Sequence, residues 1–311
     1  MSAILVFQIL VIIMAAIFTA YLLIDIFQHK ESLKGKHWLN LSLAGIITQF
    51  FDTLGIGSYG PLSAWFKIGK AVPDKLIPGT LNTCTVVTCA IMTIAYTTTI
   101  DVEIPTLIVP VVCSTIGAFL GAGLVSKLPV KQIRLGLGFA LIIVAITIMA
   151  GLLGWMPGGG EEIGLSAGKL VVLGILAFIL GALMTIGIGI YAPMMAIVYL
   201  MGLSPYVAFP LMMGSCAFLI PAAGIRFIKE SRKRNTDTYD RKAGITVNFI
   251  GIIGVLVAVF IVKSIPLTVL KWLVICVLIY TAIMLIRDAF MQSKVDVKEV
   301  KSETDPTVIT E

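Results

Sequence analysis

Nine apolar blocks make up most of this 311-residue chain. They cover residues 3–27, 39–66, 77–98, 105–126, 135–155, 167–200, 206–227, 243–262 and 266–286. Each block is long enough to cross a bilayer as a helix, which takes roughly 20 apolar residues. The chain is also 58% hydrophobic, with only 13% charged residues. We therefore predict an all-α polytopic membrane protein, which excludes a soluble enzyme, a nucleic-acid-binding module and a secreted disulfide scaffold.

The charges between the blocks predict the orientation of the chain. Loop 226–242 is rich in Lys and Arg, whereas loops 99–104 and 156–166 carry only acidic charges. Basic loops stay in the cytoplasm, so the net charge of +6 is interpreted as a topology signal and not as a surface for nucleic acid. The N-terminus is expected outside and the C-terminus inside, in the cytoplasmic membrane of a cell.

Two blocks do not fit this orientation as simple spans. Both ends of block 39–66 must be cytoplasmic, and both ends of block 167–200 must be external, if the other blocks cross once each. We therefore expect seven full spans and two broken, re-entrant segments.

The same two blocks contain an internal repeat. The stretch GIGSYGP begins at Gly55, and the similar stretch GIGIYAP begins at Gly187. When Gly55 is aligned with Gly187, ten of the 32 positions from Thr53 to Cys84 are identical. Because the two copies enter from opposite sides, we predict two inverted repeats, each with a broken re-entrant segment plus three spanning helices, and an extra N-terminal helix.

These patterns divide the chain into five parts. They are an N-terminal membrane helix with a basic cytoplasmic loop (1–38), a first transmembrane repeat (39–155), an external loop (156–166), a second transmembrane repeat (167–290) and a charged cytoplasmic tail expected to be disordered (291–311).

The interruptions predict a binding site, since irregular backbone at membrane depth must line a cavity or be buried in protein. The free N–H groups at the start of a half-helix favour an anion. The alternative is that the glycines only allow close helix packing and that the hydroxyls only bond between helices. The candidate substrate-binding residues are Gly55, Gly57, Ser58, Tyr59, Thr80, Asn82, Thr83, Gly187, Gly189, Tyr191 and Ser215.

Asp52 precedes the first break inside an apolar block, where a carboxylate is costly. It is a candidate proton-coupling or gating residue. The alternative is a structural acid that pairs with Lys67 or caps the broken backbone.

The stretches LGIGSYGP through VPDKLIPGTLNTC and IGIGIYAP through LSPYVAFPLMMGSC resemble the TauE/SafE sulfite exporter family, also called the toluene-sulfonate uptake permeases. In that family the first break is usually a longer glycine run, which Ser58 and Tyr59 interrupt here, and the N-terminal helix is expected as an addition to the family architecture. The resemblance implies transport of small sulfur-containing anions, such as sulfite, thiosulfate or organosulfonates, across a prokaryotic cytoplasmic membrane.

We therefore predict a secondary transporter with a small anion, the lipid bilayer and, as a coupling ion, protons as its partners. Energy is expected from ion gradients or the substrate's own gradient, because no Walker pattern occurs. An enzyme is not expected, because both histidines lie in the first cytoplasmic loop, no H-E-x-x-H pattern occurs and Asp52 is the only acid in the middle of a block. No catalytic residue, metal or cofactor is predicted. An anion channel and a transporter of a small non-sulfur carboxylate remain as alternatives, and the oligomeric state stays open.

Overall fold

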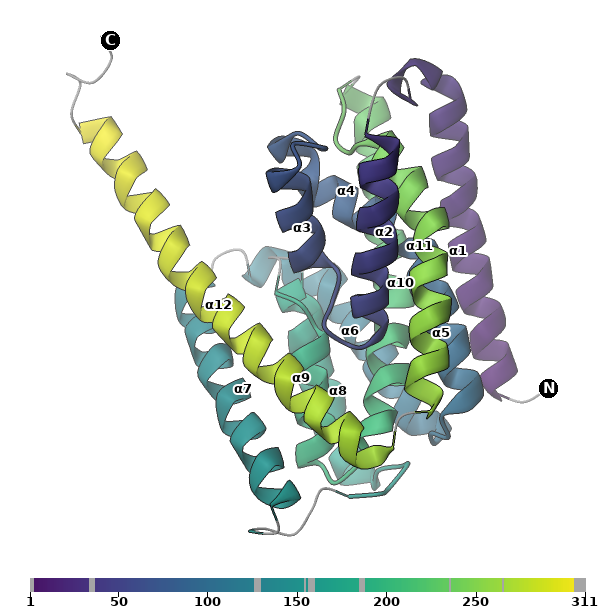
Figure 1. Ribbon diagram of the computed structural model, residues 1–311, viewed down its shortest axis with the longest axis vertical. Coiled ribbons are helices and arrows are strands. Elements are labelled where there is room, and N and C mark those ends of the chain that lie inside the picture. Colours follow the sequence, from purple (N-terminus) through teal and green to yellow (C-terminus); the bar gives the residue numbers. More distant parts are fainter. Residues whose placement is uncertain are drawn as a thin grey trace.

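The structure, a computed structural model, is built from helices throughout the part of the chain that it describes (Figure 1). That part comprises residues 3–33, 37–125, 130–153, 155, 160–184, 188–234, 236–264 and 266–304, with side chains described for all of these except 121–125, 130, 263, 264, 267 and 291–304.

The helices follow one another along the chain with short connections. Their bounds are α1 Ala3–Gln28, η1 Lys30–Leu33, α2 Trp38–Thr53, α3 Tyr59–Ile68, η2 Asp74–Leu76, α4 Ile77–Cys84, α5 Val86–Thr99, α6 Ile104–Val125, α7 Val130–Leu152, α8 Ala167–Met184, α9 Tyr191–Leu200, η3 Pro205–Val207, α10 Ala208–Arg234, α11 Arg241–Ser264 and α12 Leu267–Thr304.

Seven helical segments among the described residues are long and apolar enough to cross a membrane. Their outward faces carry large apolar side chains, such as Phe260 at 78% exposure and Ile143 at 64%, which lipid accommodates and water does not. The protein is therefore a multi-pass membrane protein. Ala167–Met184, the first arm of the block expected to be re-entrant, is one of the seven, whereas α6 is counted over its part Ile104–Leu120 alone.

Helices α2 and α3 form a hairpin whose two outer ends meet. The indole Nε1 of Trp65, near the end of α3, donates a hydrogen bond of 2.5 Å to Oδ1 of Asn40, near the start of α2. A Cβ at Gly69 would lie 2.9 Å from Nδ2 of the same asparagine. Segment 38–69 therefore begins and ends at the same end of the bundle (Figure 1).

Helices α8 and α9 form a second hairpin, whose ends meet at the opposite end of the bundle (Figure 1). Nζ of Lys169, in the first turn of α8, lies 2.9 Å from the carbonyl oxygen of Met201, just after α9. The backbone N–H of Ser204 also donates to the carbonyl of Glu162, before α8, at 2.8 Å.

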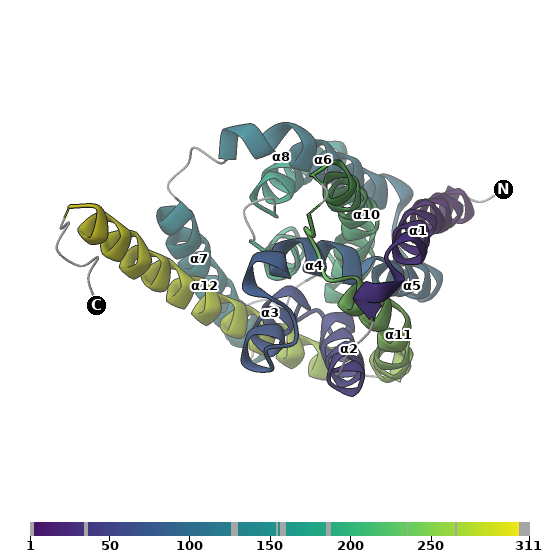
Figure 2. The same ribbon diagram turned by 90° about the horizontal axis from the view of Figure 1, so that it is seen from above.

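Close helix pairing joins the two halves of the chain. Helix α2 packs along α11, and α8 packs along α6, with α4, α5 and α10 between these two pairs (Figure 2). Glycines permit the close approach: a Cβ at Gly254 would lie 2.0 Å from the carbonyl oxygen of Ile46, and a Cβ at Gly117 would lie 2.0 Å from that of Phe178.

Two further parts lie at the sides of this arrangement. Helix α1 packs against α10 and α5, and α7 and α12 pair with each other on the other side of the molecule (Figures 1 and 2). Helix α12 continues to Thr304, so the segment predicted to be a disordered tail begins as a helix. Residues 305–311 lie outside the described part of the chain.

Candidate transport site

The first break, Leu54 to Ser58, separates α2 from α3. Gly55 and Gly57 have φ angles of 91° and 87°. This left-handed region is open to glycine and strained for residues with a Cβ. These two glycines therefore allow the turn of the first break, whereas substrate binding by them stays a prediction.

Asp52 lies in the last turn of α2 with 3% of its surface exposed. The hydroxyl and the backbone N–H of Ser58, the residue before α3, hydrogen-bond to its carboxylate. The carboxylate thus sits at the N-terminus of α3, where a negative charge is favoured. Among the described residues Asp52 has no ion pair with Lys67, so capping of the break, and not that pairing, is the structural role present.

The second break lies between Met184 and Tyr191. Its first residues, 185–187, lie outside the described part of the chain, so the candidate Gly187 has no structural assignment. Gly189 is described and is not among the glycines with positive φ. A Cβ at this position would meet nothing within 4 Å, so Gly189 borders open space and is not required by the turn.

The two breaks lie against each other. A Cβ on Gly55 would fall 2.2 Å from Cε of Met195 in α9 and 3.2 Å from Cε of Met212 in α10. A Cβ on Gly57 would lie 3.9 Å from Cδ2 of Tyr191, the first residue of α9. Corresponding segments of the two repeats, which are far apart in the sequence, therefore meet inside the bundle.

Tyr59 and Tyr191, which occupy corresponding positions in the two repeats, begin the two half-helices. The Tyr59 hydroxyl donates a 3.1 Å hydrogen bond to Oδ1 of Asn82, and the ring of Tyr191 borders Gly57 in the first break. The structure thus brings these candidate residues together around the first break.

The other predicted hydroxyls are engaged within their own helices. The Oγ1 atoms of Thr80 and Thr83 donate to the carbonyls of Leu76 and Gly79 at 2.7 and 3.0 Å, and Oγ of Ser215 donates to a carbonyl one turn earlier at 2.8 Å. Thr80 also accepts a hydrogen bond from the backbone N–H of Asp240. These protons are not free for a ligand in this conformation.

Several residues at the breaks escaped the sequence analysis. The hydroxyl of Tyr96 donates a 2.6 Å hydrogen bond to the carbonyl of Thr53, the last residue of α2. Sγ of Cys89 lies next to the thiol of Cys216 and 3.5 Å from the carbonyl oxygen of Met213. In the sequence, the one feature that pointed to these cysteines was the identity of Cys84 with Cys216 in the aligned repeat.

A third interruption occurs at Thr85, between α4 and α5, in a block that was expected to be one continuous span. The side chain of Asn248 bridges it from α11. Its Oδ1 accepts from the backbone N–H of Val87 at 2.9 Å, and its Nδ2 donates to the carbonyl of Thr83 at 2.6 Å. One amide side chain therefore replaces the helical bonds that the kink removes.

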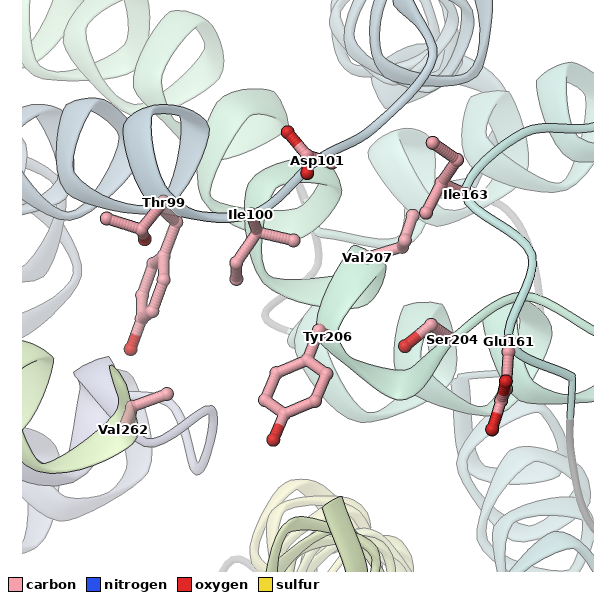
Figure 3. A pocket seen from close by; sticks show the side chains of 10 residues that line it. Thr99, Ile100, Asp101, Glu161, Ile163, Ser204, Tyr206, Val207 and Val262 are labelled. Atoms are coloured by element: carbon pink, nitrogen blue, oxygen red, sulfur yellow. The ribbon is translucent and has the colours of Figure 1, made fainter. Parts of the chain in front are cut away.

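A cavity of about 320 Å³ opens at the end of the bundle where α8 begins and α9 ends (Figure 3). Tyr206, which projects into it, Ser204 and the acidic residues Asp101 and Glu161 line this cavity. Tyr96 also lines it. Because the hydroxyl of Tyr96 bonds to the end of α2, the cavity leads toward the first break.

The fold defines a helical, multi-pass membrane protein with two interrupted hairpins that meet in its interior. Residues 1–148 match the family model described as Sulfite exporter TauE/SafE. This confirms the resemblance over that part of the chain. The match begins at residue 1, so α1 lies within the family architecture and the expectation that it is an addition was wrong. Neither a curated protein nor a solved structure matches the chain.

Proposed function

We propose that this protein is a secondary transporter of a small anion, with sulfur oxyanions and organosulfonates as its substrate class. The observation that carries the proposal is the contact between the two helix breaks at Gly55 and Met195 and at Gly57 and Tyr191. Interrupted helices that meet near the membrane midplane form the binding sites of secondary transporters. The match of residues 1–148 to the sulfite exporter family model supports the same class of activity.

The proposal includes two inverted repeats, supported by the packing of the halves. Ile46 and Phe178 occupy corresponding positions when Gly55 is aligned with Gly187, and the carbonyl of each lies against a glycine of the opposite half. The hairpins α2–α3 and α8–α9 correspond in the same way and open toward opposite ends of the bundle. With the N-terminus outside, the cavity at Tyr206 becomes an external vestibule.

The two half-helices differ in how their N-termini are occupied. Asp52 supplies a carboxylate to the start of α3, whereas the corresponding position of the second repeat is Met184. An incoming oxyanion is therefore favoured at the start of α9 and competes with Asp52 at the start of α3. Protonation of Asp52 removes this competing charge, so that proton and anion would bind together.

Flux measurements on the full chain in proteoliposomes test the substrate class. Labelled sulfite, thiosulfate, a small sulfonate and acetate are compared, with and without an imposed pH gradient. We expect saturable uptake of at least one sulfur anion, stimulated when the side of entry is acidified. Flux that does not saturate would indicate a channel, and saturable flux of acetate alone would assign a carboxylate transporter.

Substitution of Asp52 tests the coupling. A small sulfonate is the best probe, because its charge does not change between pH 5 and pH 8. In Asp52→Asn, the neutral amide imitates the protonated carboxyl, and we expect sulfonate flux that no longer responds to pH. Glu230→Gln, in an exposed pair with Arg234, is the control and should keep the wild-type response. An unchanged pH response in Asp52→Asn would rule out coupling through this residue.

A further inference from the structure

The side chain of Gln49 in α2 is completely buried, with 0% exposure. Both of its amide atoms, Nε2 and Oε1, lack a hydrogen-bond partner, and they are the only buried side-chain nitrogen or oxygen atoms in this condition among the described residues. An unpaired buried amide costs a protein stability, because water would otherwise satisfy it. A bound group that pairs with the amide would remove this cost.

The polar groups around Gln49 are already engaged elsewhere. Thr88 of α5 donates its hydroxyl to the carbonyl of Thr85 at 3.0 Å, and Thr53 donates to the backbone carbonyl of Gln49 at 2.7 Å. The protein therefore provides a partner for the main chain at position 49 but none for the side-chain amide.

The fold makes room for this side chain. A Cβ on Gly251 of α11 would lie 2.8 Å from Cγ of Gln49 and 3.2 Å from Cγ2 of Thr88. Only a glycine at position 251 leaves space for the glutamine between α2, α5 and α11. Gln49 shares the buried face of α2 with Asp52 and Thr53, which lie one helical turn further along.

We propose that Gln49 is a ligand-binding residue of the transport site, whose Nε2 donates a hydrogen bond to an oxygen of the transported oxyanion. This inference rests on the proposed function, because it names a contact of the same site. The corresponding position of the second repeat is Gly181, which has no side chain to donate. The amide is therefore a feature of the first half alone and makes the site asymmetric, as Asp52 does.

Binding and stability are measured on the detergent-purified full chain for the wild type, Gln49→Leu and Thr48→Val. Leucine removes the amide at similar volume. Thr48 is the matched control. It is buried in the position before Gln49, and its hydroxyl donates to the carbonyl of Ala44 in its own helix, at 2.7 Å. The probes are sulfite, thiosulfate, a small sulfonate and acetate, each titrated at fixed ionic strength while the melting temperature is followed.

We expect Gln49→Leu to melt at or above the wild-type temperature without ligand, since an unpaired amide is removed. Its Kd for the anion that stabilises the wild type should rise about tenfold or more, whereas Thr48→Val should bind like the wild type. A lower melting temperature of ligand-free Gln49→Leu would assign the amide to an ordered water only and overturn the proposal. Wild-type affinity in Gln49→Leu would overturn it and leave the transporter standing, while an anion panel that the wild type does not bind would overturn both.

Discussion

Gly254 of α11 lies so close to Ile46 of α2 that a Cβ at position 254 would be 2.0 Å from the Ile46 carbonyl oxygen. Gly117 of α6 and Phe178 of α8 have the same relationship, also at 2.0 Å. In lipid, where apolar side chains gain nothing by leaving the solvent, such small-residue contacts are a main source of helix association. The two contacts hold the leading helix of each hairpin against a helix of the other half.

Substitution of Gly254 by alanine should therefore destabilise the bundle. The added methyl group would meet backbone on α2, which cannot move aside as a flexible side chain would, and we expect a loss of about 1–3 kcal/mol. The melting temperature of the purified protein measures this loss. Gly117→Ala should behave in the same way at the α6–α8 contact.

Gly136 of α7 provides the matched control, since it is helical and a Cβ there would meet nothing within 4 Å. Alanine has the higher helix propensity, so Gly136→Ala should melt at or slightly above the wild-type temperature. Equal melting temperatures for Gly254→Ala and Gly136→Ala would show that the close α2–α11 contact is not required.

The kink at Thr85 gives a second prediction. Asn248 satisfies the backbone N–H of Val87 and the carbonyl of Thr83. Asn248→Ala would leave both groups unpaired, at about 1–3 kcal/mol each, so we expect a melting temperature well below that of the wild type. Thr246→Val is the control, because the buried Thr246 hydroxyl bonds only to the carbonyl of Lys242 in its own helix. A comparable loss in both variants would contradict a special role for the amide.

Local signals explain which features could be predicted from the sequence. The apolar helices and the two breaks depend on composition and spacing within short windows, and the structure has long apolar helices and interruptions at Leu54–Ser58 and between Met184 and Tyr191. The kink at Thr85 could not be predicted, because the Asn248 side chain that stabilises it comes from a distant part of the sequence, in α11. The same limit applies to Tyr96 and its bond to Thr53.

Asp240 gives a prediction for the pH dependence of stability, since it lies between α10 and α11, outside the membrane-spanning helices. Burial raises the pKa of its carboxyl above the ordinary value, against the opposing hydrogen bond from the N–H of Ala243. A raised pKa means that the folded state holds the proton more firmly than the unfolded state. Stability from this group is therefore present at low pH and is lost as the pH rises through the folded-state pKa.

Asp240→Asn keeps an acceptor for Ala243 but does not ionise. The melting temperature of this variant relative to the wild type should rise with pH from near the ordinary carboxyl pKa and then reach a plateau. Melting curves of both proteins from pH 4 to pH 8 measure the difference. A difference that is constant with pH would show that ionisation of Asp240 carries no cost in the folded state.

The buried carboxylate of Asp25 gives the last prediction. Its side chain, with 0% exposure, joins the end of α1 to α10 and α11, accepting from Nε of Arg232 at 3.0 Å, from Nε of Arg241 at 2.6 Å and from the hydroxyl of Tyr239 at 2.7 Å. Asp25→Ala would leave Arg232 without this carboxylate and Arg241 with Asp237 as its remaining acidic partner. Breaking a buried charge cluster is strongly destabilising, so we expect a loss of up to about 3–5 kcal/mol.

The control for Asp25 is Glu230, whose pair with Arg234 is exposed, and Glu230→Gln should change stability by less than about 1 kcal/mol. Melting temperatures of the two variants at low and high salt distinguish the buried charge cluster of Asp25 from the exposed pair of Glu230 and Arg234. Salt screens exposed charges far more than buried ones, so the loss in Asp25→Ala should persist at high salt. If that loss instead disappeared with salt, the cluster would be open to water, and α1 would be held to α10 and α11 by apolar packing alone.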